Sequence, residues 1–261
     1  MMNKASSENI VKTLTSTLLN QSFIIDDEDT LLKYQQMVAS YVRLEQCVGV
    51  LSDFRANCSY IYSGSFGQIF NLYDENMVVD SAFEEVIFSK IHADDLLERH
   101  ALELNYFQFL KTIDQKERSR YTTFSRIRVL NEDGSFTYIN HRTIYVKSFT
   151  NGSIWLSLCL YAPCTDVQSK QGIDGKIMDA VTGKILEVES YGYYGKKLLT
   201  KRELEILTLV AQGEGSKQIA ETLNIALHTV HRHRQNIINK MQVSNTTEAV
   251  KTALVMGIIS I

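Results

Sequence analysis

The sequence predicts an α+β protein in which an antiparallel sheet with helices precedes an all-α unit of four helices. Alternating or uniformly apolar runs, separated by glycine turns, occupy the middle of the chain and indicate strands. Apolar residues spaced three and four apart occupy residues 1–46 and 198–261 and indicate helices. The length of 261 residues is sufficient for two domains, each with its own core.

The composition is that of an ordinary soluble globular protein, with 44% apolar and 22% charged residues. No apolar run approaches the roughly 20 residues that a membrane-spanning helix needs, and the first residues lack a signal-peptide pattern. The four cysteines have no CxxC spacing, so we expect neither a disulfide framework nor a zinc site. These features together predict a cytoplasmic protein without contact to a membrane.

The first half of the chain is expected to pass from helices to short strands and back. Residues 1–46 form an N-terminal helical segment that covers a sheet or mediates pairing. VGVLSDF and SYIYSG then have the pattern of strands, and SGSFGQIFNL that of a glycine-containing turn entering a short helix. Residues 83–113 indicate a long helical stretch with a break near His92.

Three further strands are expected in YTTFSRIRVL, SFTYINHRTIYVKSF and SIWLSLCLYAP. Asp133-Gly134 and Asn151-Gly152 separate them, and such pairs favour tight hairpins. Residues 47–165 are therefore assigned to one sheet domain. Residues 166–197 are assigned to a linker with an extra hairpin around Thr182-Gly183 and a glycine-containing hinge, YGYYGKK.

Residues 198–261 have signals for four short helices. Thr200 and Glu203 fit a capping box at the start of the first helix. Gly213 and Gly215 end that helix, and Ser216 is expected to cap the second. The inward residues of these two helices are expected to be Leu204, Leu207, Val210, Ala211, Ile219, Ala220 and Leu223.

The third helix, from about 227 to 241, is predicted to have two different faces. Its apolar face comprises Val230, Ile237, Ile238 and Met241. Its polar face has hydrogen-bond donors suited to base edges and phosphates and comprises His228, His231, Arg232, Gln235 and Asn239. Asn245 with Glu248 is expected to cap a fourth helix, which is apolar enough to pair with a second subunit as well.

Charge supports a nucleic-acid partner for this unit. From Lys196 onward the chain has nine Lys or Arg and five Asp or Glu, a net charge of +4. The preceding residues have a net charge of −7, since the whole chain has −3. A basic C-terminal unit on an acidic body is typical of a polyanion-binding module joined to a domain that does not bind DNA.

Residues 198–257 resemble the DNA-binding domain of the LuxR/FixJ (NarL-like) transcription regulators. The resemblance is specific because many positions match in order: Leu199-Thr200, Arg202-Glu203, Glu205, Leu207, Ala211, Gly213, Lys217, Ile219-Ala220, Leu223, Thr229-Val230, His233, Ile237, Lys240 and Glu248-Ala249. It implies that the third helix lies in the major groove, usually in a dimer on two half-sites. By position, it implies base contacts from His231, Arg232 and Gln235, and phosphate contacts from Lys217, Thr229, Arg234 and Lys240.

The chain departs from this family pattern at three places. Ala226 replaces the serine that caps the third helix, and losing such a cap costs about 1 kcal/mol. His231 replaces a lysine, which suggests weaker or pH-sensitive phosphate attraction or another base preference. Thr246 replaces an arginine before the fourth helix. His233 is expected to pack at the helix edge, and Arg234 is either a phosphate contact or a solvated flank.

Residues 46–163 resemble a PAS domain. Two strands, short helices, a longer helix and three antiparallel strands follow in that order, IHADD stands at a typical His-Pro-x-Asp position, and RIRVLNEDGSFTYI is similar to another PAS segment. Tyr138 and Ala93 replace the usual Trp and Pro. The resemblance implies a sensor of small ligands or a protein-interaction domain, but it does not identify a ligand or cofactor.

Individual side chains in this half have mainly structural interpretations. His92 is expected to orient the loop before the long helix rather than bind a metal, and His100 has only a weak case as a haem ligand. Asn57-Cys58 lies too far upstream to face a flavin. Trp155 and Tyr161 are expected in the core or on a dimer surface.

The sequence therefore predicts a DNA-binding transcription regulator whose PAS-like domain senses a signal or mediates dimerisation. Expected partners are double-stranded DNA, a second copy of the chain, and RNA polymerase or a signalling protein; an unidentified small molecule is the only candidate ligand.

A phospho-acceptor receiver is the second reading, since FIIDDED resembles an acidic strand end, but the later receiver motifs are missing. An enzyme is the third, but no GxSxG, HExxH or phosphate loop is present, and we predict no catalytic residue and no metal site. An autoinducer-binding domain would need a more aromatic pocket than a single Trp suggests.

Overall fold

The computed structural model describes residues 4–23, 28–166, 172–186, 199–241, 243, 245–255 and 258–259. The chain divides into two compact units, which we call the sheet unit and the helical unit. The sheet unit comprises Leu18–Glu103 and Asp114–Ile185. The helical unit comprises Met1–Thr17, Leu104–Ile113 and Leu186–Ile261. Within the described ranges, no helix is both long and apolar enough to cross a membrane.

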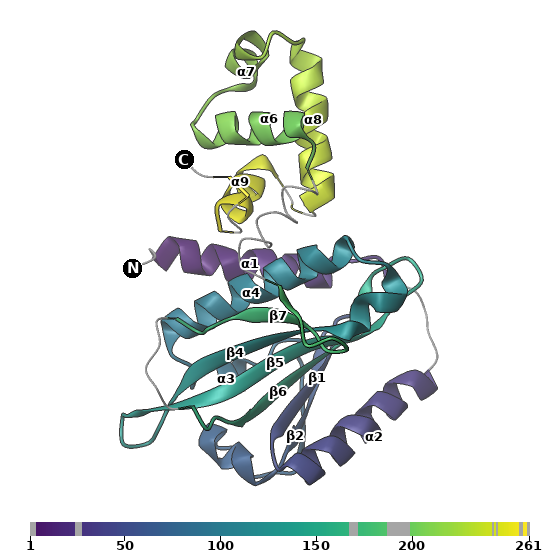
Figure 1. Ribbon diagram of the computed structural model, residues 1–261, viewed down its shortest axis with the longest axis vertical. Coiled ribbons are helices and arrows are strands. Elements are labelled where there is room, and N and C mark those ends of the chain that lie inside the picture. The colour runs from purple at the N-terminus through teal and green to yellow at the C-terminus, as the bar shows by residue number, and fades with distance from the viewer. Residues whose placement is uncertain are drawn as a thin grey trace. The chain divides into compact units, whose positions relative to one another are not determined.

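An eight-stranded sheet forms the centre of the sheet unit, in the order β3-β2-β1-β6-β5-β4-β7-β8 (Figure 1). Neighbouring strands from β3 to β7 in this order pair antiparallel. The strands are β1 (Val48–Asp53), β2 (Cys58–Ser63), β3 (Asn76–Val79), β4 (Tyr121–Leu130), β5 (Phe136–Ser148), β6 (Ile154–Pro163), β7 (Lys176–Asp179) and β8 (Ile185–Leu186). The α+β prediction is confirmed, and an antiparallel sheet differs from the doubly wound parallel sheet of a receiver.

The two glycine-containing turns predicted between the long strands are confirmed. Gly134 joins β4 to β5 with a φ of +81°, and Gly152 joins β5 to β6 with a φ of +86°. Positive φ costs glycine little, because it has no Cβ. The tight turns therefore fix the register of the three strands that form the middle of the sheet.

The hairpin predicted around Thr182-Gly183 is confirmed as β7 and β8, and it extends the sheet beyond the strands assigned to it from the sequence. β7 and β8 lie around Gly183, which also has a positive φ, and β7 pairs with β4 so that Tyr121 lies opposite Asp179. β3 was not predicted, because NMVV is too short to show a period. The hinge segment YGYYGKK and the FIIDDED residues 24–27 lie outside the described residues.

The helix α2 (Glu28–Glu45) packs on β1 and β2 with Val38 and Val42 buried. A Cβ on Gly49 of β1 would lie 2.7 Å from Val42 Cγ2, so the close approach of helix and strand requires glycine there. The predicted apolar stripe of this helix is only partly correct, because Met37 and Leu44 are 64% and 83% exposed. α2 therefore covers the sheet with a narrower face than the sequence indicates.

The other elements before β4 follow the predicted order. The early helix is α1 (Lys4–Leu19), and the glycine-containing turn becomes the 3-10 helix η1 (Ser65–Phe70). The long helical stretch is broken at His92 into α3 (Glu85–Phe88) and α4 (Ala93–Lys111), and the 3-10 helix η2 (Gln115–Arg120) leads into β4. His92 Nδ1 accepts from the backbone N–H of Asp94 at 3.2 Å, which confirms its structural role at the start of α4.

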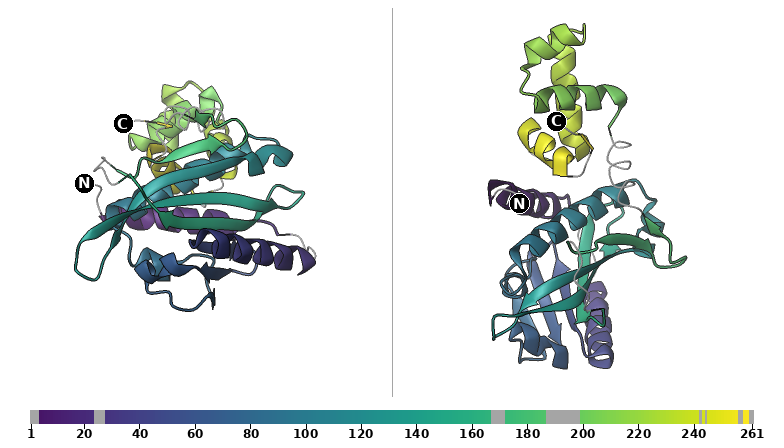
Figure 2. Two further views of the ribbon diagram at one scale, coloured as in Figure 1. Left: turned by 60° about the horizontal axis from the view of Figure 1, so that its bottom comes forward. Right: turned by 60° about the vertical axis from the view of Figure 1, so that its left-hand side comes forward.

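Four short helices carry the C-terminal part of the helical unit: α6 (Lys201–Ala211), α7 (Ser216–Thr222), α8 (Leu227–Met241) and α9 (Thr246–Val255) (Figure 2). The capping box of α6 is confirmed, since Thr200 Oγ1 accepts from the Glu203 N–H and Glu203 Oε2 accepts from the Thr200 N–H at 2.7 Å. The side chain of Glu248 is not described, so the second predicted capping box stays a prediction.

The core of these helices contains most of the predicted inward residues and some others. Ile206 is fully buried but was not predicted, while Leu204, Val210 and Ala211 are only partly buried. On α8, Val230, Ile237 and Met241 are buried and Ile238 is partly buried, as the 3.6-residue period requires. The residues of this core from α6 to α9 are Ile206, Leu207, Ile219, Ala220, Val230, Ile237, Met241, Ala249 and Ala253.

Candidate nucleic-acid interface

The solvent face of α8 has the donors expected of a groove-reading helix. His228, His231, Arg232 and Gln235 are exposed, and Gln235 Nε2 donates to Asn239 Oδ1 at 3.1 Å. Because the opposite face is fixed in the core, these side chains point away from the unit and share one stripe. The structure thus brings together the three predicted base-contact residues, His231, Arg232 and Gln235.

Two cations of the helical unit are exposed. Arg232 on α8 and Lys217 in the first turn of α7 are exposed and make no ion pair with any described residue. Free cationic side chains can neutralise phosphates and release counterions at little structural cost. Thr229 is half-buried, and its hydroxyl lies 3.5 Å from His228 Nε2, so it is less accessible than those two.

The beginning of α8 lacks a side-chain cap. Thr229 N–H and Val230 N–H are 2.9 and 3.3 Å from the carbonyl oxygen of Ala226, and the methyl group of Ala226 cannot accept a hydrogen bond. Asn224 in the preceding turn has a φ of +49°, which asparagine tolerates better than most residues. The turn geometry is therefore specified, whereas the first N–H groups of α8 have no side-chain acceptor at the capping position.

Arg234 connects three helices. Its Nη1 donates to Ser216 Oγ at the first residue of α7 at 2.7 Å, and its Nε donates to Thr246 Oγ1 at the first residue of α9 at 3.2 Å. The interpretation as a solvated flank is wrong, because the side chain is half-buried and bonded at both sites. Ser216 was predicted to cap α7, but the residue at that capping position is Gly215, so the serine hydroxyl is available to Arg234.

Lys240 neutralises a buried carboxylate. Its Nζ lies 2.7 Å from Oε2 of Glu203, whose side chain is 2% exposed. Glu203 also accepts from the Thr200 N–H, and these hydrogen bonds hold its pKa below the usual value although burial acts in the opposite direction. The ammonium group predicted for phosphate is thus engaged inside the unit, as is the guanidinium of Arg234.

His233 and Arg202 complete this framework. His233 is half-buried, and its Nδ1 has no hydrogen-bond partner among the described residues, in line with its expected position at the helix edge. Arg202 donates to the carbonyl of Leu223 at 2.8 Å and pairs with Glu205 at 2.7 Å. This cap on the C-terminus of α7 was not predicted, because Arg202 lies 21 residues from Leu223 in the sequence.

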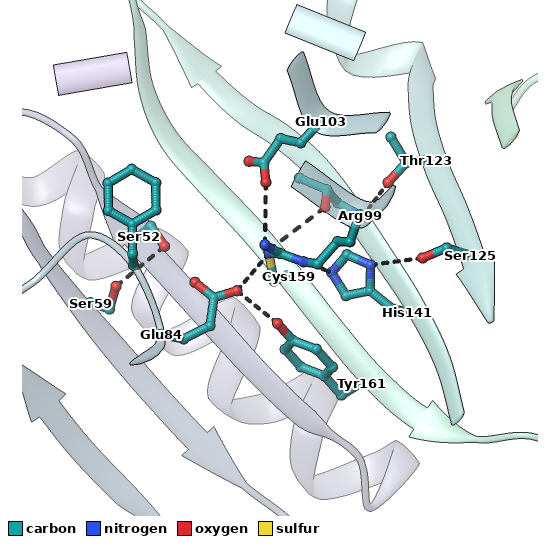
Figure 3. A network of polar contacts seen from close by, with 12 residues as sticks. Ser52, Ser59, Glu84, Arg99, Glu103, Thr123, Ser125, His141, Cys159 and Tyr161 are labelled. Atoms are coloured by element: carbon teal, nitrogen blue, oxygen red, sulfur yellow. Dashed lines mark hydrogen bonds and ion pairs between the residues drawn. The ribbon is translucent and has the colours of Figure 1, made fainter. Parts of the chain in front are cut away.

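A second polar cluster lies inside the sheet unit, around Arg99 of α4 (Figure 3). Arg99 donates to Glu84 at 2.8 Å and to His141 Nε2 at 3.2 Å, and it lies 3.5 Å from Glu103. Tyr161 donates to Glu84 at 2.7 Å, and Trp155 and Tyr161 are both fully buried, so the core is the correct one of the two predicted alternatives. The cluster was not predicted, since charged residues are seldom buried unless they are paired.

The protonation of this cluster follows from burial. Burial, with the nearby charge of Arg99, lowers the pKa of His141 well below its ordinary value, so its ring is neutral. Its Nε2 then accepts from Arg99, and Nδ1–H donates to Ser125 at 3.1 Å. Burial raises the pKa of the Cys159 thiol well above its usual value, which makes it a poor nucleophile. Burial also lowers the pKa of His100 to about 3, and within the described residues no group of metal-binding side chains includes it.

The comparison with protein families concerns the C-terminal region. Residues 197–253 match the family described as bacterial regulatory proteins, luxR family. The chain is 45% identical over 69 residues to the uncharacterized response regulatory protein YgeK of Escherichia coli K12, covering 26% of this chain and 47% of that protein. It is 47% identical over 58 residues to the oxygen regulatory protein NreC of Staphylococcus aureus, covering 22% of this chain and 27% of that protein.

A solved structure described as a VqmA–ligand–DNA complex of Vibrio cholera aligns with 87% of this chain and 90% of that chain, at 14% identity and a TM-score of 0.31. Agreement at that score is too weak to support any argument about this protein. The chain spans about half or less of the length of the curated relatives it matches. The similarity to the luxR family of bacterial regulatory proteins is therefore established for residues 197–253.

Proposed function

We propose that the protein is a transcriptional regulator whose helical unit binds double-stranded DNA through the solvent face of α8. One observation carries the proposal: His231, Arg232 and Gln235 form an exposed donor stripe on a helix whose other face is fixed in the core. An α-helix fits the major groove, where arginine and glutamine distinguish base pairs by hydrogen bonding. The match of residues 197–253 to luxR-family regulatory proteins supports the same function.

The contacts divide the seven predicted residues into three groups. His231, Arg232, Gln235 and Lys217 are exposed and suited to DNA. Arg234 and Lys240 hold the scaffold, and a phosphate contact from either would compete with hydrogen bonds inside the unit. Thr229, half-buried beside His228, is suited to a phosphate near the start of α8.

We propose that the sheet unit is PAS-like and senses a signal or mediates homodimerisation. Its elements follow the order that the resemblance implies, and the two segments that carry the resemblance meet in the structure. Asp95 of the IHADD segment accepts from the backbone N–H of Arg128 at 2.7 Å and pairs with its guanidinium. In this proposal a signal changes whether two helical units of a dimer can occupy two half-sites together.

Selection from random duplexes with the full-length protein tests the DNA-binding proposal. Enrichment of an inverted repeat is expected, and Arg232→Ala should weaken binding to it by about 1–3 kcal/mol and relax the preference at one base pair. Lys217→Ala should weaken binding to all duplexes similarly. It should also reduce the slope of the logarithm of the binding constant against the logarithm of the salt concentration by about 1. Arg43→Ala, which removes an exposed arginine of α2, is the matched control.

Absence of any enriched sequence, or equal binding by Arg232→Ala and wild type, would refute the assignment of α8. Native mass spectrometry of the full-length protein, with an absorbance scan, separates the two roles of the sheet unit. A mass excess lost on denaturation supports ligand sensing, whereas an exact apo mass in a dimer supports dimerisation. A half-site geometry that is the same with and without the signal would contradict the allosteric part.

A further inference from the structure

A cavity of about 270 Å³ lies where the β7–β8 hairpin joins β4. Its walls combine apolar side chains and donors with the carboxylates of Asp166 and Asp174. The apolar residues and donors include Phe124, Arg126, Asn140, Lys176, Met178 and Ile185. All of these residues belong to the sheet unit. Such a mixture of apolar walls and a few polar groups is typical of small-molecule sites, and the volume suits a small ligand.

Arg126 is the unusual member of this lining. Its side chain is 6% exposed, and its guanidinium stacks on Tyr138 with Cζ 4.6 Å from the ring centroid. Nη1 donates to the Asp166 carbonyl at 2.8 Å and lies 3.1 Å from Asp166 Oδ2. Nε and Nη2, by contrast, are buried and have no hydrogen-bond partner in the described part of the chain. Among the described residues, the guanidinium is thus held on one side and has no acceptor on the other.

The two unsatisfied nitrogens form one edge of the guanidinium plane. Their N–H bonds are parallel, and this spacing matches the two oxygens of a carboxylate. A buried donor without an acceptor is destabilising, so two at the same edge need an explanation. A bound acceptor with two oxygens would satisfy both donors at once.

Position and charge restrict what this acceptor is. Side chains alternate along β4, and Ser125 bonds His141 in the internal cluster, so Arg126 faces the opposite side. Lys176 is paired with Asp174 at 2.9 Å, and Arg126 with Asp166, so the cavity does not have the excess of cations that a multiply charged anion needs. Residues 167–171 contain no Asp or Glu, so that neighbouring stretch of sequence cannot supply a carboxylate.

We propose that this cavity binds a small molecule with one carboxylate and an apolar body. Its two oxygens accept from Nε and Nη2 of Arg126, and its apolar part contacts Phe124, Met178 and Ile185. This ligand would be a signal for the sensing role, and in that respect the inference rests on the proposed function. The binding itself requires no DNA, so the two can fail separately.

Titration of full-length protein containing [¹⁵N]arginine with benzoate tests the site. One side-chain Nε–H resonance, which is missing in Arg126→Lys, is expected to shift on addition of benzoate and not of the neutral benzamide. Arg126→Lys keeps the charge but loses the paired N–H edge, so we expect at least about a tenfold loss of benzoate affinity. Saturation-transfer NMR measures this affinity. The emission of Trp155, which is fully buried in the same unit, verifies folding.

A second variant keeps the test decisive should Arg126→Lys not fold. Ile185→Glu places an anion in the cavity wall at a half-exposed position. It is expected to lower the affinity for benzoate several-fold, which corresponds to about 0.5–1 kcal/mol of binding free energy. Val181→Glu, at a 71% exposed position of the same hairpin, is the matched control and should leave the affinity unchanged.

Three results would overturn the inference: no Arg Nε–H shift at about 10 mM benzoate, an equal shift with benzamide, or equal weakening by the two glutamate variants. If the protein binds the selected duplexes normally but does not bind benzoate, the cavity assignment alone is overturned. Benzoate binding without any selected duplex would instead refute the DNA-binding proposal and leave the cavity site intact.

Discussion

Replacement of Glu103 by glutamine should remove a pH-dependent loss of stability. Burial raises the pKa of Glu103 to about 7, with the Glu84 charge acting in the same direction and Arg99 opposing both. The folded protein therefore binds this proton more tightly than the unfolded chain, whose carboxyl has the ordinary value of 4.5. The contribution of this proton to the free energy of unfolding is fully present below pH 4.5 and is lost as the pH rises through 7. The free energy of unfolding falls by about 3 kcal/mol over this range.

Urea unfolding of wild type and Glu103→Gln between pH 5 and 8, followed by Trp155 emission, measures this contribution. Trp155 is the single tryptophan and lies in the sheet unit, so its signal reports the unfolding of the unit that contains Glu103. The buried, neutral His141 and His100 destabilise the fold at low pH, but they do so equally in both proteins and cancel in the difference.

The variant should therefore gain about 2–3 kcal/mol relative to wild type between pH 5 and 8. Glu45→Gln, which changes an exposed carboxylate of α2, should follow the wild-type curve. If the free energies of unfolding of wild type and Glu103→Gln remain parallel over this range, Glu103 does not hold its proton in the folded state, and the account of the Arg99 cluster is wrong.

Two further predictions concern the helical unit. Ala226→Ser supplies the missing acceptor at the start of α8 and should stabilise that unit by about 1 kcal/mol, measured as slower amide exchange over residues 227–230; unchanged exchange would contradict it. Lys240→Met leaves the buried carboxylate of Glu203 without its counter-ion and should lower the free energy of unfolding by about 1–3 kcal/mol. Thermal unfolding monitored by circular dichroism measures this change. Lys201→Met, at an exposed position in the first turn of α6, is its control, and equal effects of the two variants would refute the buried-pair argument.

The helical unit could be predicted closely because its signals are local. The capping box of Thr200 and Glu203, the glycine breaks and the 3.6-residue period of α8 each involve residues within a few positions of one another. The hairpins of the sheet unit could be predicted for the same reason, since Gly134 and Gly152 specify turns without reference to the rest of the chain.

Contacts between distant segments could not be read from the sequence. Arg234 meets Ser216 and Thr246 across 18 and 12 residues, and Lys240 meets Glu203 across 37, so their pairing follows from helix packing rather than from any periodic pattern. The Arg99 cluster joins α4 to β5 and β6 in the same way. The role of Arg126 could not be predicted, because it lies between buried residues of β4, where the alternation of a strand usually places a solvent-facing residue. The cavity at Arg126 is formed together with residues of β7, which is distant in the sequence.

The bridging role of Arg234 has a consequence for how such a protein can change its target. Arg232 and Gln235 lie two residues before and one residue after it, on the same helix, yet both are exposed and neither has a hydrogen bond to a described residue of α7 or α9. Under the proposed DNA-binding function, mutations at those exposed positions would alter which bases are preferred without loosening the framework that presents them. Duplicated copies of the gene could diverge toward new operators by a few substitutions on one face of α8, while the opposite face and Arg234 stay under selection for stability.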